Sequence, residues 1–290
     1  MPSLDEILQS PHATIVPGVY DPLSARIAVR AGAKCLYLTG FGVAGAGFGV
    51  PDVGLVTASE MIERVGVIAG ASAPVPLIAD GDNGHGGVLN AAKLTRAYER
   101  AGAAAIQLED QVFPKRCGHM EDKEVIPTTD AAQKIRAAAE SRGSKSFKIV
   151  ARTDARATHD LDEALRRGEA FLKAGADILF IEAPRSEDEL KRVAAAFKGT
   201  PLLANIVEDG KTPLLTPQEL EALGYKIILY PISALLSVTK KLEEVYDLLV
   251  KGDRKSLDAS RSTFAHYNEI MNLPELLAVT DRLSNTNSET

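Results

Sequence analysis

Residues 100–109 read Arg-Ala-Gly-Ala-Ala-Ala-Ile-Gln-Leu-Glu, and the opening of this stretch recurs at two other places in the chain. Arg-Ala-Gly-Ala also stands at 30–33, and Lys-Ala-Gly-Ala stands at 173–176. A glycine just past a helix supplies the left-handed residue that ends it, and the apolar run that follows indicates that a strand begins almost at once. The repeated joint therefore predicts repeated strand–helix units, as in a parallel sheet wrapped by helices.

Short β-rich runs alternate with longer helical ones along the chain. The predicted strands are Ala13–Pro17, Cys35–Thr39, Val75–Asp80, Ala104–Glu109, Phe147–Arg152, Ile178–Glu182, Pro201–Asn205 and Lys226–Tyr230. The predicted helices are Pro22–Ala31, Ser59–Ala69, Val88–Ala101, Thr129–Ser141, Leu161–Ala174, Ser186–Phe197, Thr216–Leu223 and Ala234–Val250. A doubly wound sheet uses the same local pattern, but about eight such units close a barrel. The count favours a (β/α)8 TIM barrel.

Beyond the barrel, residues 256–283 read as a C-terminal helical extension with several apolar positions, and the polar tail 284–290 is expected to be disordered. The chain shows no low-complexity linker, so residues 1–290 are predicted to form a single domain.

Composition excludes several classes of protein. The 290 residues carry a formal net charge of −6, which argues against the clustered Lys and Arg of a nucleic-acid-binding surface. No apolar run approaches the ~20 residues that a membrane-spanning helix needs. Only two cysteines occur, and the N-terminus lacks the apolar region of a signal peptide, which together predict a cytoplasmic protein with free thiols.

Polar side chains follow nearly every predicted strand, at the edge where barrel enzymes place their active sites. Among them, four acids fall on two neighbouring strand ends: Asp80, Asp82, Glu109 and Asp110. Carboxylates this close repel one another, so a positive group should lie among them, and oxygen ligands with room for water suit Mg²⁺. The alternative is that Asp80 only caps the following turn and Glu109 pairs with a lysine.

Arg152 ends the apolar run that begins at Lys148. A guanidinium there needs an anion, and its planar fork suits a substrate carboxylate. The alternative is a structural salt bridge with Asp154 or Glu182.

The segment 112–123 is long, charged and glycine-containing, which is typical of an active-site lid. Within it, Cys117 is flanked by Lys115, Arg116 and His119, and neighbouring cations favour a reactive thiolate. The other cysteine, Cys35, starts a predicted strand and is expected to serve packing. His85 could contact a metal or substrate, or could simply face solvent.

Taken together, these motifs resemble the isocitrate lyase/phosphoenolpyruvate mutase superfamily from about Tyr20 to Leu283. Lys-Arg-Cys-Gly-His at 115–119 resembles the lyase branch, since phosphonate-forming mutases generally lack that cysteine. One departure is Asp-Gly-Asp-Asn-Gly at 80–84, where the family commonly has Asp-Ala-Asp-Thr-Gly, and another is Phe41, where some branches carry a smaller or polar residue.

The resemblance assigns roles position by position. It implies Asp82 as the direct ligand of Mg²⁺, with Mn²⁺ as a substitute, and Asp52, Asp80 and Glu109 as ligands acting through water. It implies a catalytic loop in which Cys117 donates a proton, together with Lys115 and His119. The substrate-binding residues that it implies are Tyr37, Thr39, Gly40, Phe41, Gly118, Arg152, Glu182, Asn205 and Pro231.

The implied reaction is a retro-aldol cleavage of a small 2-hydroxydicarboxylate. An arginine that follows the Tyr-Pro stretch in the methylisocitrate branch is here Leu236, which cannot pair a third carboxylate. Pro231 stands where the oxaloacetate-hydrolysing branch tends to have serine. These residues favour 2,3-dimethylmalate or a related alkylmalate, cleaved to pyruvate and propionate or a related acid.

Other functions stay open at this point: 2-methylisocitrate lyase, oxaloacetate acetylhydrolase or decarboxylase, carboxyvinyl-carboxyphosphonate phosphorylmutase, and a non-catalytic metal-binding barrel. The resemblance also implies a homotetramer whose C-terminal helices are exchanged between paired subunits. The net charge and the short apolar runs lead us to expect no nucleic-acid or membrane partner.

Overall fold

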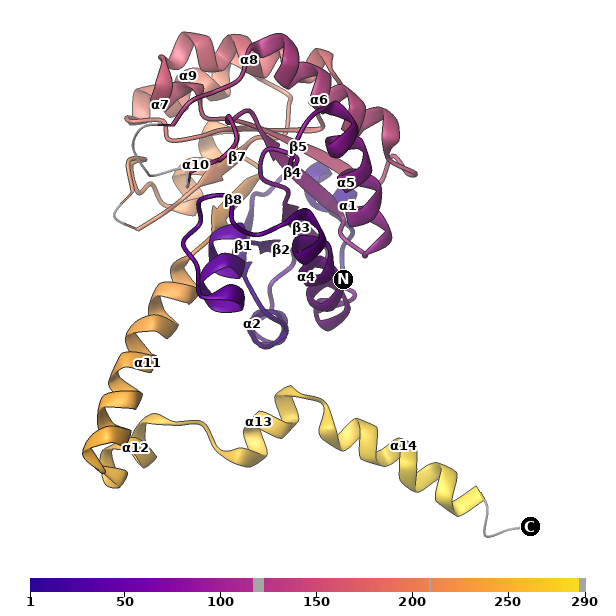
Figure 1. The fold of residues 1–290 in the computed structure, drawn as a ribbon, viewed down its shortest axis with the longest axis vertical. Helices are drawn as coiled ribbons and strands as arrows, with labels where there is room; N and C mark the ends of the chain where they lie inside the picture. The colour runs from indigo at the N-terminus through magenta and orange to yellow at the C-terminus, as the bar shows by residue number, and fades with distance from the viewer. Residues whose placement is uncertain (117–122, 209, 287–290) are drawn as a thin grey trace. The chain divides into compact units, whose positions relative to one another are not determined.

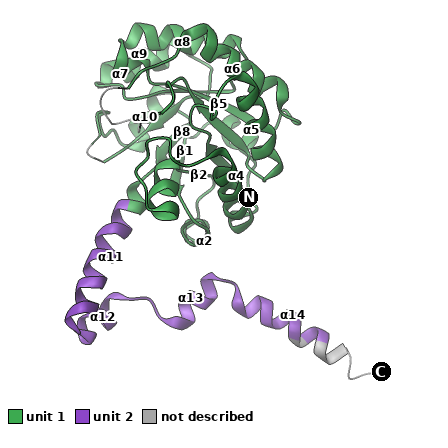
Figure 2. Ribbon diagram, viewed as in Figure 1, with its two compact units in different colours: residues 1–235 green, residues 236–290 purple. Residues whose placement is uncertain are grey.

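The computed structural model describes residues 1–116, 123–208 and 210–286. Two compact units divide the chain, residues 1–235 and residues 236–290 (Figure 2). Cys117, Gly118 and His119 of the predicted catalytic loop lie outside the described residues, and so does the end of the predicted tail.

Eight parallel strands form the centre of the first unit (Figure 1). They are β1 (Thr14–Val19), β2 (Leu36–Leu38), β3 (Leu77–Asp80), β4 (Ala105–Glu109), β5 (Lys148–Thr153), β6 (Ile178–Ile181), β7 (Leu203–Asn205) and β8 (Ile227–Tyr230). Consecutive strands pair from β1 to β6, β7 pairs with β8, and β1 also pairs with β8. A bridge from Leu179 to Leu202 joins β6 to the start of β7, which closes the circle. The predicted barrel is confirmed, and the doubly wound sheet is excluded.

Helices surround this barrel at the positions that the sequence predicts, with boundary shifts of a few residues. They are α2 (Pro22–Arg30), α4 (Ala58–Ser72), α5 (Val88–Arg100), α6 (Thr128–Ser141), α8 (Leu161–Lys173), α9 (Glu187–Ala196) and α10 (Pro217–Leu223). The helix predicted at 234–250 is α11 (Ser233–Lys251), most of which belongs to the second unit. The glycines of the three repeated joints, Gly32, Gly102 and Gly175, have φ values of 92°, 98° and 104°. They are the left-handed residues that the repeated phrase requires.

Four short helical segments were not predicted: α1 (Leu4–Gln9), α3 (Gly40–Gly42), η1 (Val43–Gly47) and α7 (Ala155–Thr158). In α1, Ser3 and Glu6 form a capping box. Leu4 and Ile7 are buried in the same apolar cluster as Val16 and Ile227, inside the barrel. Helix α1 therefore closes the N-terminal end of the barrel with its two apolar side chains.

The pleat of the strands divides the barrel interior into an apolar and a polar part. Along β4, alternate residues Ala105, Gln107 and Glu109 face inward, because successive side chains of a strand point to opposite faces. Ala105 belongs to the inner apolar cluster, and Glu109 lines the pocket at the opposite end. The same order holds for Val150 and Arg152 on β5. The interior is thus apolar at the N-terminal ends of the strands and polar at their C-terminal ends.

The second unit holds most of α11 and three further helices, α12 (Arg254–Ser260), α13 (Phe264–Ile270) and α14 (Leu273–Thr286). The predicted extension 256–283 is therefore helical but interrupted twice, with Thr263 capping α13 and Asn272 in the left-handed region before α14. Because α14 continues to Thr286, residues 284–286 of the predicted disordered tail are helical. In the described residues, no helix combines the length and the apolar character needed to cross a membrane.

Candidate active site

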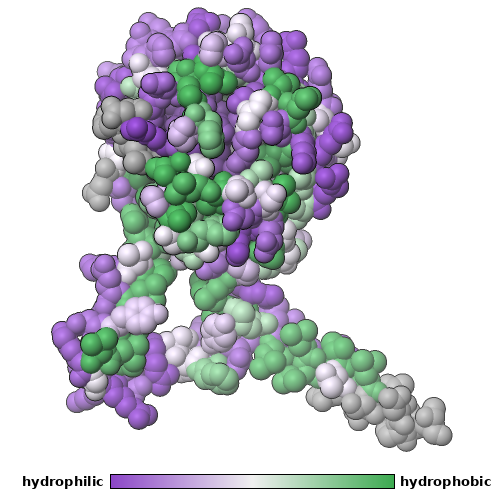
Figure 3. All heavy atoms as spheres, in the orientation of Figure 1, coloured by the Kyte–Doolittle hydropathy of each residue, from purple (hydrophilic) through white to green (hydrophobic). Residues whose placement is uncertain are grey.

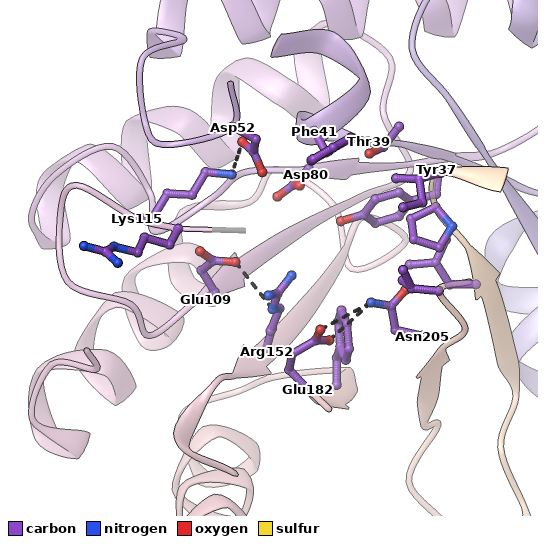
Figure 4. Close-up of a pocket in the computed structure, with 16 residues that line it drawn as sticks. Tyr37, Thr39, Phe41, Asp52, Asp80, Glu109, Lys115, Arg152, Glu182 and Asn205 are labelled. Carbon is purple, nitrogen blue, oxygen red and sulfur yellow. Dashed lines mark hydrogen bonds and ion pairs between the residues drawn. The ribbon is translucent and has the colours of Figure 1, made fainter. Parts of the chain in front are cut away.

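A pocket lies at the C-terminal ends of the strands and gathers most of the predicted site residues (Figure 4). Predicted residues that line it are Tyr37, Thr39, Phe41, Asp52, Asp80, Glu109, Lys115, Arg152, Glu182, Asn205 and Pro231. They come from seven of the eight strand ends and from the loops that follow, so the barrel itself brings them together. Gly40 and Asp82 lie directly beside the pocket through their contacts with Asp80 and Lys115.

Asp80 is fixed from three sides. The backbone amide of Gly40 donates to its Oδ2 at 3.2 Å, and the amide of Asp82 donates to its Oδ1 at 3.0 Å. Gln107 Nε2 donates to the same Oδ1 at 3.3 Å. Burial, together with the neighbouring Asp82 carboxylate, raises the pKa of Asp80 to about 6. Asp80 therefore caps its turn, as the alternative interpretation had it, and also faces the pocket.

The turn that carries Asp82 is strained. Asp82 and His85 both lie in the left-handed region, with φ values of 48° and 51°. Gly81 between the two acids passes so close to β4 that a Cβ atom there would lie 2.6 Å from the carbonyl oxygen of Gln107. His85 Nε2 lies 3.8 Å from Asp82 Oδ2, and burial lowers the pKa of His85. His85 is thus a neutral neighbour of Asp82, not a solvent-facing side chain.

Lys115 supplies the positive charge that the acid cluster demands. Its Nζ contacts Asp52 Oδ1 and lies 2.8 Å from Asp82 Oδ1, and its side chain is only 5% exposed. Burial alone would lower the pKa of Lys115, but Asp82 and Asp52 outweigh burial and raise it well above its usual value. Burial would likewise raise the pKa of Asp82, yet the Lys115 ammonium brings the net pKa below its ordinary value.

In the described residues, one carboxylate oxygen of the cluster has no hydrogen-bond donor, and a second has the Lys115 ammonium as its neighbour. Glu109 Oε1 is buried and accepts no hydrogen bond in the described structure, and the buried Asp82 Oδ1 has the Lys115 ammonium beside it at 2.8 Å. Such oxygens are costly unless a cation or water satisfies them. In the described part of the chain, no three His, Cys, Asp or Glu side chains converge closely enough to hold a metal directly. The donor set therefore fits a hard divalent cation held by few protein oxygens and several waters.

Arg152 makes the salt bridge with Asp154 that was the alternative expectation, and it also lines the pocket. Its Nε and Nη2 donate to the two carboxylate oxygens of Asp154 at 2.9 and 3.0 Å, and its Nε lies 3.5 Å from Glu109 Oε2. Its guanidinium also lies over the Phe180 ring, 5.1 Å from the centroid, and lines the pocket. Lys123 Nζ donates to Asp154 Oδ1 at 2.7 Å. The salt bridge to Asp154 thus orients the guanidinium instead of removing it from the site.

Asp110 is not part of the acid cluster, contrary to its predicted place beside Glu109. It follows Glu109 directly, so the pleat turns it away from the barrel interior. Its carboxylate accepts hydrogen bonds from Thr153 Oγ1 at 2.6 Å, the amide of Asp154 at 2.9 Å and Arg167 Nη1 at 2.9 Å. Asp110 therefore holds the end of β5, and with it the Arg152–Asp154 pair.

The far wall of the pocket combines polar groups with an apolar surface. Asn205 Nδ2 donates to the two carboxylate oxygens of Glu182 at 3.5 and 3.3 Å, and the Tyr37 hydroxyl donates to Gln107 Oε1 at 2.7 Å. Burial raises the pKa of Tyr37 well above its usual value, so this phenol stays protonated.

Five pocket residues were not assigned to the site from the sequence: Arg116, Phe180, Val207, Leu229 and Ile232. Two of them could have been predicted from the alternation of side chains along a strand, because residues two positions apart point to the same face. Phe180 stands two residues before Glu182, and Leu229 stands two residues before Pro231. Cys35, by contrast, is fully buried in the inner apolar cluster, and burial raises the pKa of its thiol to about 12, which confirms its packing role.

A barrel with buried carboxylates facing an oriented arginine at its C-terminal rim defines a class of (β/α)8 enzymes that bind small anionic substrates. Residues 4–249 match the family described as phosphoenolpyruvate phosphomutase, and the chain belongs to this family. The superfamily resemblance seen in the sequence is thereby confirmed.

Several curated relatives of this chain are named lyases. The 2,3-dimethylmalate lyase of Eubacterium barkeri is 43% identical over 275 residues, which cover 94% of each chain. A 2-methylisocitrate lyase of Bacillus subtilis is 40% identical over 244 residues, covering 84% of this chain and 79% of the relative. The prediction of a lyase is confirmed at the level of these relatives.

Solved structures agree over nearly the whole length. Oxaloacetate acetylhydrolase in complex with 3,3-difluorooxalacetate superposes with a TM-score of 0.92 at 32% identity, covering 97% of this chain and 96% of that one. A phosphonopyruvate hydrolase in complex with oxalate and Mg²⁺ has a TM-score of 0.85 at 30% identity, covering 96% and 97%.

Proposed function

We propose that this chain is a Mg²⁺-dependent carbon–carbon lyase that cleaves a 2-hydroxydicarboxylate, with 2,3-dimethylmalate or a related alkylmalate as its substrate. The observation that carries the proposal is the composition of one pocket. Buried carboxylates that suit a divalent cation and the Arg152 guanidinium line the same pocket, with Arg152 Nε 3.5 Å from Glu109 Oε2 (Figure 4), and the apolar side chains of Phe180, Val207 and Leu229 line it as well. A substrate with two carboxylates and alkyl substituents complements all three.

The acid cluster is the proposed metal site. Glu109 offers a buried oxygen without a hydrogen bond, Asp82 offers a buried oxygen that lies beside the Lys115 ammonium, and Asp52 and Asp80 line the same pocket. Such a site suits Mg²⁺, with Mn²⁺ as a substitute, and a neighbouring family structure contains Mg²⁺ with oxalate. When bound, the cation would draw electron density from the hydroxyl and the adjacent carboxylate of the substrate.

The residues of the chain supply binding and orientation. Arg152, held in one plane by Asp154, can bind a carboxylate through the donors that face the pocket. Thr39, Gly40 and Phe41 follow β2 at the rim, and because the Gly40 amide donates to Asp80, the Thr39 hydroxyl and the Phe41 amide are the proposed donors to the other carboxylate. The substrate hydroxyl gives its proton to a basic group of the pocket, its oxygen becomes the carbonyl oxygen of the 2-oxo acid, and the bond between the carbinol carbon and its neighbour breaks. The electron pair then passes to the second acid.

That second acid needs a proton on carbon, and the proposed donor is Cys117 in the loop with Lys115 and His119. Phe180, Val207 and Leu229 surround the reacting carbons with apolar side chains and limit the access of water. The products from 2,3-dimethylmalate are pyruvate and propionate.

The choice of an alkylmalate rests on the apolar wall and on Pro231. The backbone of Pro231 packs directly against Gly18 at the rim. A Cβ atom at position 18 would lie 2.0 Å from the Pro231 carbonyl oxygen, so only glycine fits at position 18. Proline offers no hydroxyl to a hydrated keto group, which disfavours hydrolysis of oxaloacetate. Leu236 is the first residue of the second unit, and its inability to pair a third carboxylate of the substrate stays a prediction.

The experiment is a substrate panel with coupled detection of pyruvate, in Mg²⁺, for wild type and Cys117→Ser. We expect pyruvate from 2,3-dimethylmalate with wild type, and a loss of about 100-fold or more in the variant. If 2-methylisocitrate gave pyruvate and succinate at a higher kcat/KM than 2,3-dimethylmalate, the tricarboxylate would be the substrate instead of the alkylmalate. Oxalate and acetate from oxaloacetate would refute the argument from Pro231, and silence on the whole panel would refute the lyase.

The second unit supports a proposal about assembly. Exposed large apolar side chains occur on α11, α13 and α14, and Figure 3 shows hydrophobic residues gathered along these helices. They include Tyr246, Val250, Phe264, Leu276 and Leu283. We propose that a second copy of the chain covers them in a homotetramer, which light scattering of the full chain would measure. A cytoplasmic location likewise stays a proposal from the sequence.

A further inference from the structure

The ammonium group of Lys115 lies among the carboxylates that the proposed function assigns to a divalent cation. Its Nζ contacts Asp52 Oδ1 and lies 2.8 Å from Asp82 Oδ1. Lys115 thus uses an oxygen of Asp82, the residue proposed to bind the cation directly. The contact is buried, since the side chains of Lys115, Asp52 and Asp82 are 5%, 10% and 7% exposed.

We propose that Lys115 is a displaceable counter-ion of the acid cluster, which competes with Mg²⁺ for Asp82 and Asp52. This inference rests on the proposed function. An ammonium group and a divalent cation that share the same oxygens would lie within a few ångströms of each other, where two positive charges repel strongly. The cation can therefore bind Asp82 only when the Lys115 ammonium leaves it.

The charges around the cluster show why the protein needs such a group. Asp52, Asp80, Asp82 and Glu109 carry four carboxylates into one buried region, and Arg152 is shared with Asp154. Four buried acids without a nearby cation would repel one another and destabilise the fold. Lys115 relieves this repulsion in the absence of metal, and it lowers the apparent affinity for Mg²⁺ because the metal must replace it.

Lys123 offers a matched control. It is also a buried lysine with an aspartate partner, since its Nζ lies 2.7 Å from Asp154 Oδ1 and its side chain is 2% exposed. Its partner belongs to the arginine side of the pocket and not to the acid cluster. Lys115→Met and Lys123→Met therefore each remove one buried positive charge, but only the first removes the competitor.

The experiment measures Mg²⁺ binding to the full chain by titration calorimetry, after removal of metal with EDTA. We expect Lys115→Met to bind Mg²⁺ about tenfold more tightly than wild type, and Lys123→Met to stay within about twofold. In EDTA the Lys115→Met protein should melt below wild type, and saturating Mg²⁺ should remove or reverse that difference.

The outcomes separate this inference from the proposed function. If no variant and no wild type binds Mg²⁺, the metal site itself is wrong. If wild type binds and Lys115→Met binds equally or more weakly, only the competition is refuted. Equal tightening in Lys123→Met also refutes it, because the effect would then come from total charge.

A second measurement needs no variant. Wild-type protein is acylated briefly with an amine-reactive ester, with and without Mg²⁺, and the modification of individual lysines is followed by peptide mass spectrometry. We expect Mg²⁺ to increase the rate at Lys115 several-fold, because the displaced ammonium leaves its buried pair, and to leave Lys123 unchanged. An unchanged or slower rate at Lys115 overturns the inference.

Discussion

Replacing Asp154 by asparagine removes the anion that orients the arginine of the pocket. The Asp154 side chain is fully buried and accepts from Arg152 at 2.9 and 3.0 Å and from Lys123 at 2.7 Å. Burial would raise the pKa of Asp154, but Arg152 and Lys123 more than offset it and lower the pKa from 3.8 to about 2. That shift corresponds to about 2 kcal/mol of stability at neutral pH.

The full cost should be larger, because the asparagine variant leaves two buried cations with less negative charge around them. Removal of one partner of a buried pair costs about 3–5 kcal/mol. We expect this loss in the free energy of unfolding, measured by urea titration at pH 7.5 and followed by circular dichroism. A suitable control is Asp177→Asn, which breaks the pair with Arg142 where the aspartate is 25% exposed, at an expected cost of about 1–2 kcal/mol.

The stability that Asp154 contributes is expected to fall as the pH falls. Between pH 4 and pH 2 the unfolded chain binds a proton at Asp154 that the folded chain does not, so the contribution of Asp154 is complete above pH 4 and declines as the pH falls. Wild type and Asp154→Asn should therefore converge in stability over this range. A variant within about 1 kcal/mol of wild type at pH 7.5, or a constant gap on acidification, would refute the assignment of Asp154 as the orienting anion.

Three further predictions concern packing and charge at the rim and in the barrel. Gly18→Ala should lower the free energy of unfolding by about 1–3 kcal/mol or more, because the added Cβ would collide with the Pro231 carbonyl. The control Gly66→Ala, which has open space around it inside α4, should raise the free energy of unfolding by about 0.5–1 kcal/mol. Equal urea midpoints for the two variants would contradict this prediction. Glu109→Gln should stabilise the metal-free protein at pH 7.5 and weaken Mg²⁺ binding in calorimetry, because burial raises the pKa of Glu109 well above its usual value and its charged form is therefore disfavoured in the fold. Phe180→Ala should cost about 3–5 kcal/mol in a urea titration and shift preference toward larger alkyl substituents in the substrate panel, and a loss below about 1 kcal/mol would show that the ring is not packed as described.

Local patterns in the sequence were sufficient for the barrel because its signals are local. The helix–Gly–strand joints at Gly32, Gly102 and Gly175 depend only on neighbouring residues. Eight strand–helix units are the number that closes into a barrel. Helix α1 could not be predicted in the same way, since its role depends on Leu4 and Ile7 meeting the inside of a barrel formed by distant strands.

The site shows the same division between local and distant information. Strand-end polarity predicted Glu109 and Arg152 correctly as pocket residues, because both stand at inward positions of their strands. Asp110 was misplaced because adjacency in sequence was taken for adjacency in space, although the pleat reverses direction at each residue. That Lys115 fills the acid cluster depends on a loop folding back onto β3, which no local pattern indicates.

The alternation inside the barrel has a consequence for how such a protein can change over time. On β4 and β5 the residues that hold the fold, Ala105 and Val150, are separated from those that carry the chemistry, Glu109 and Arg152, by no more than four positions of the same strand. Substitutions at the upper positions alter what is bound without disturbing the apolar layer beneath them. New specificities can therefore arise by exchanging a few rim side chains, while the strands that present them keep their places.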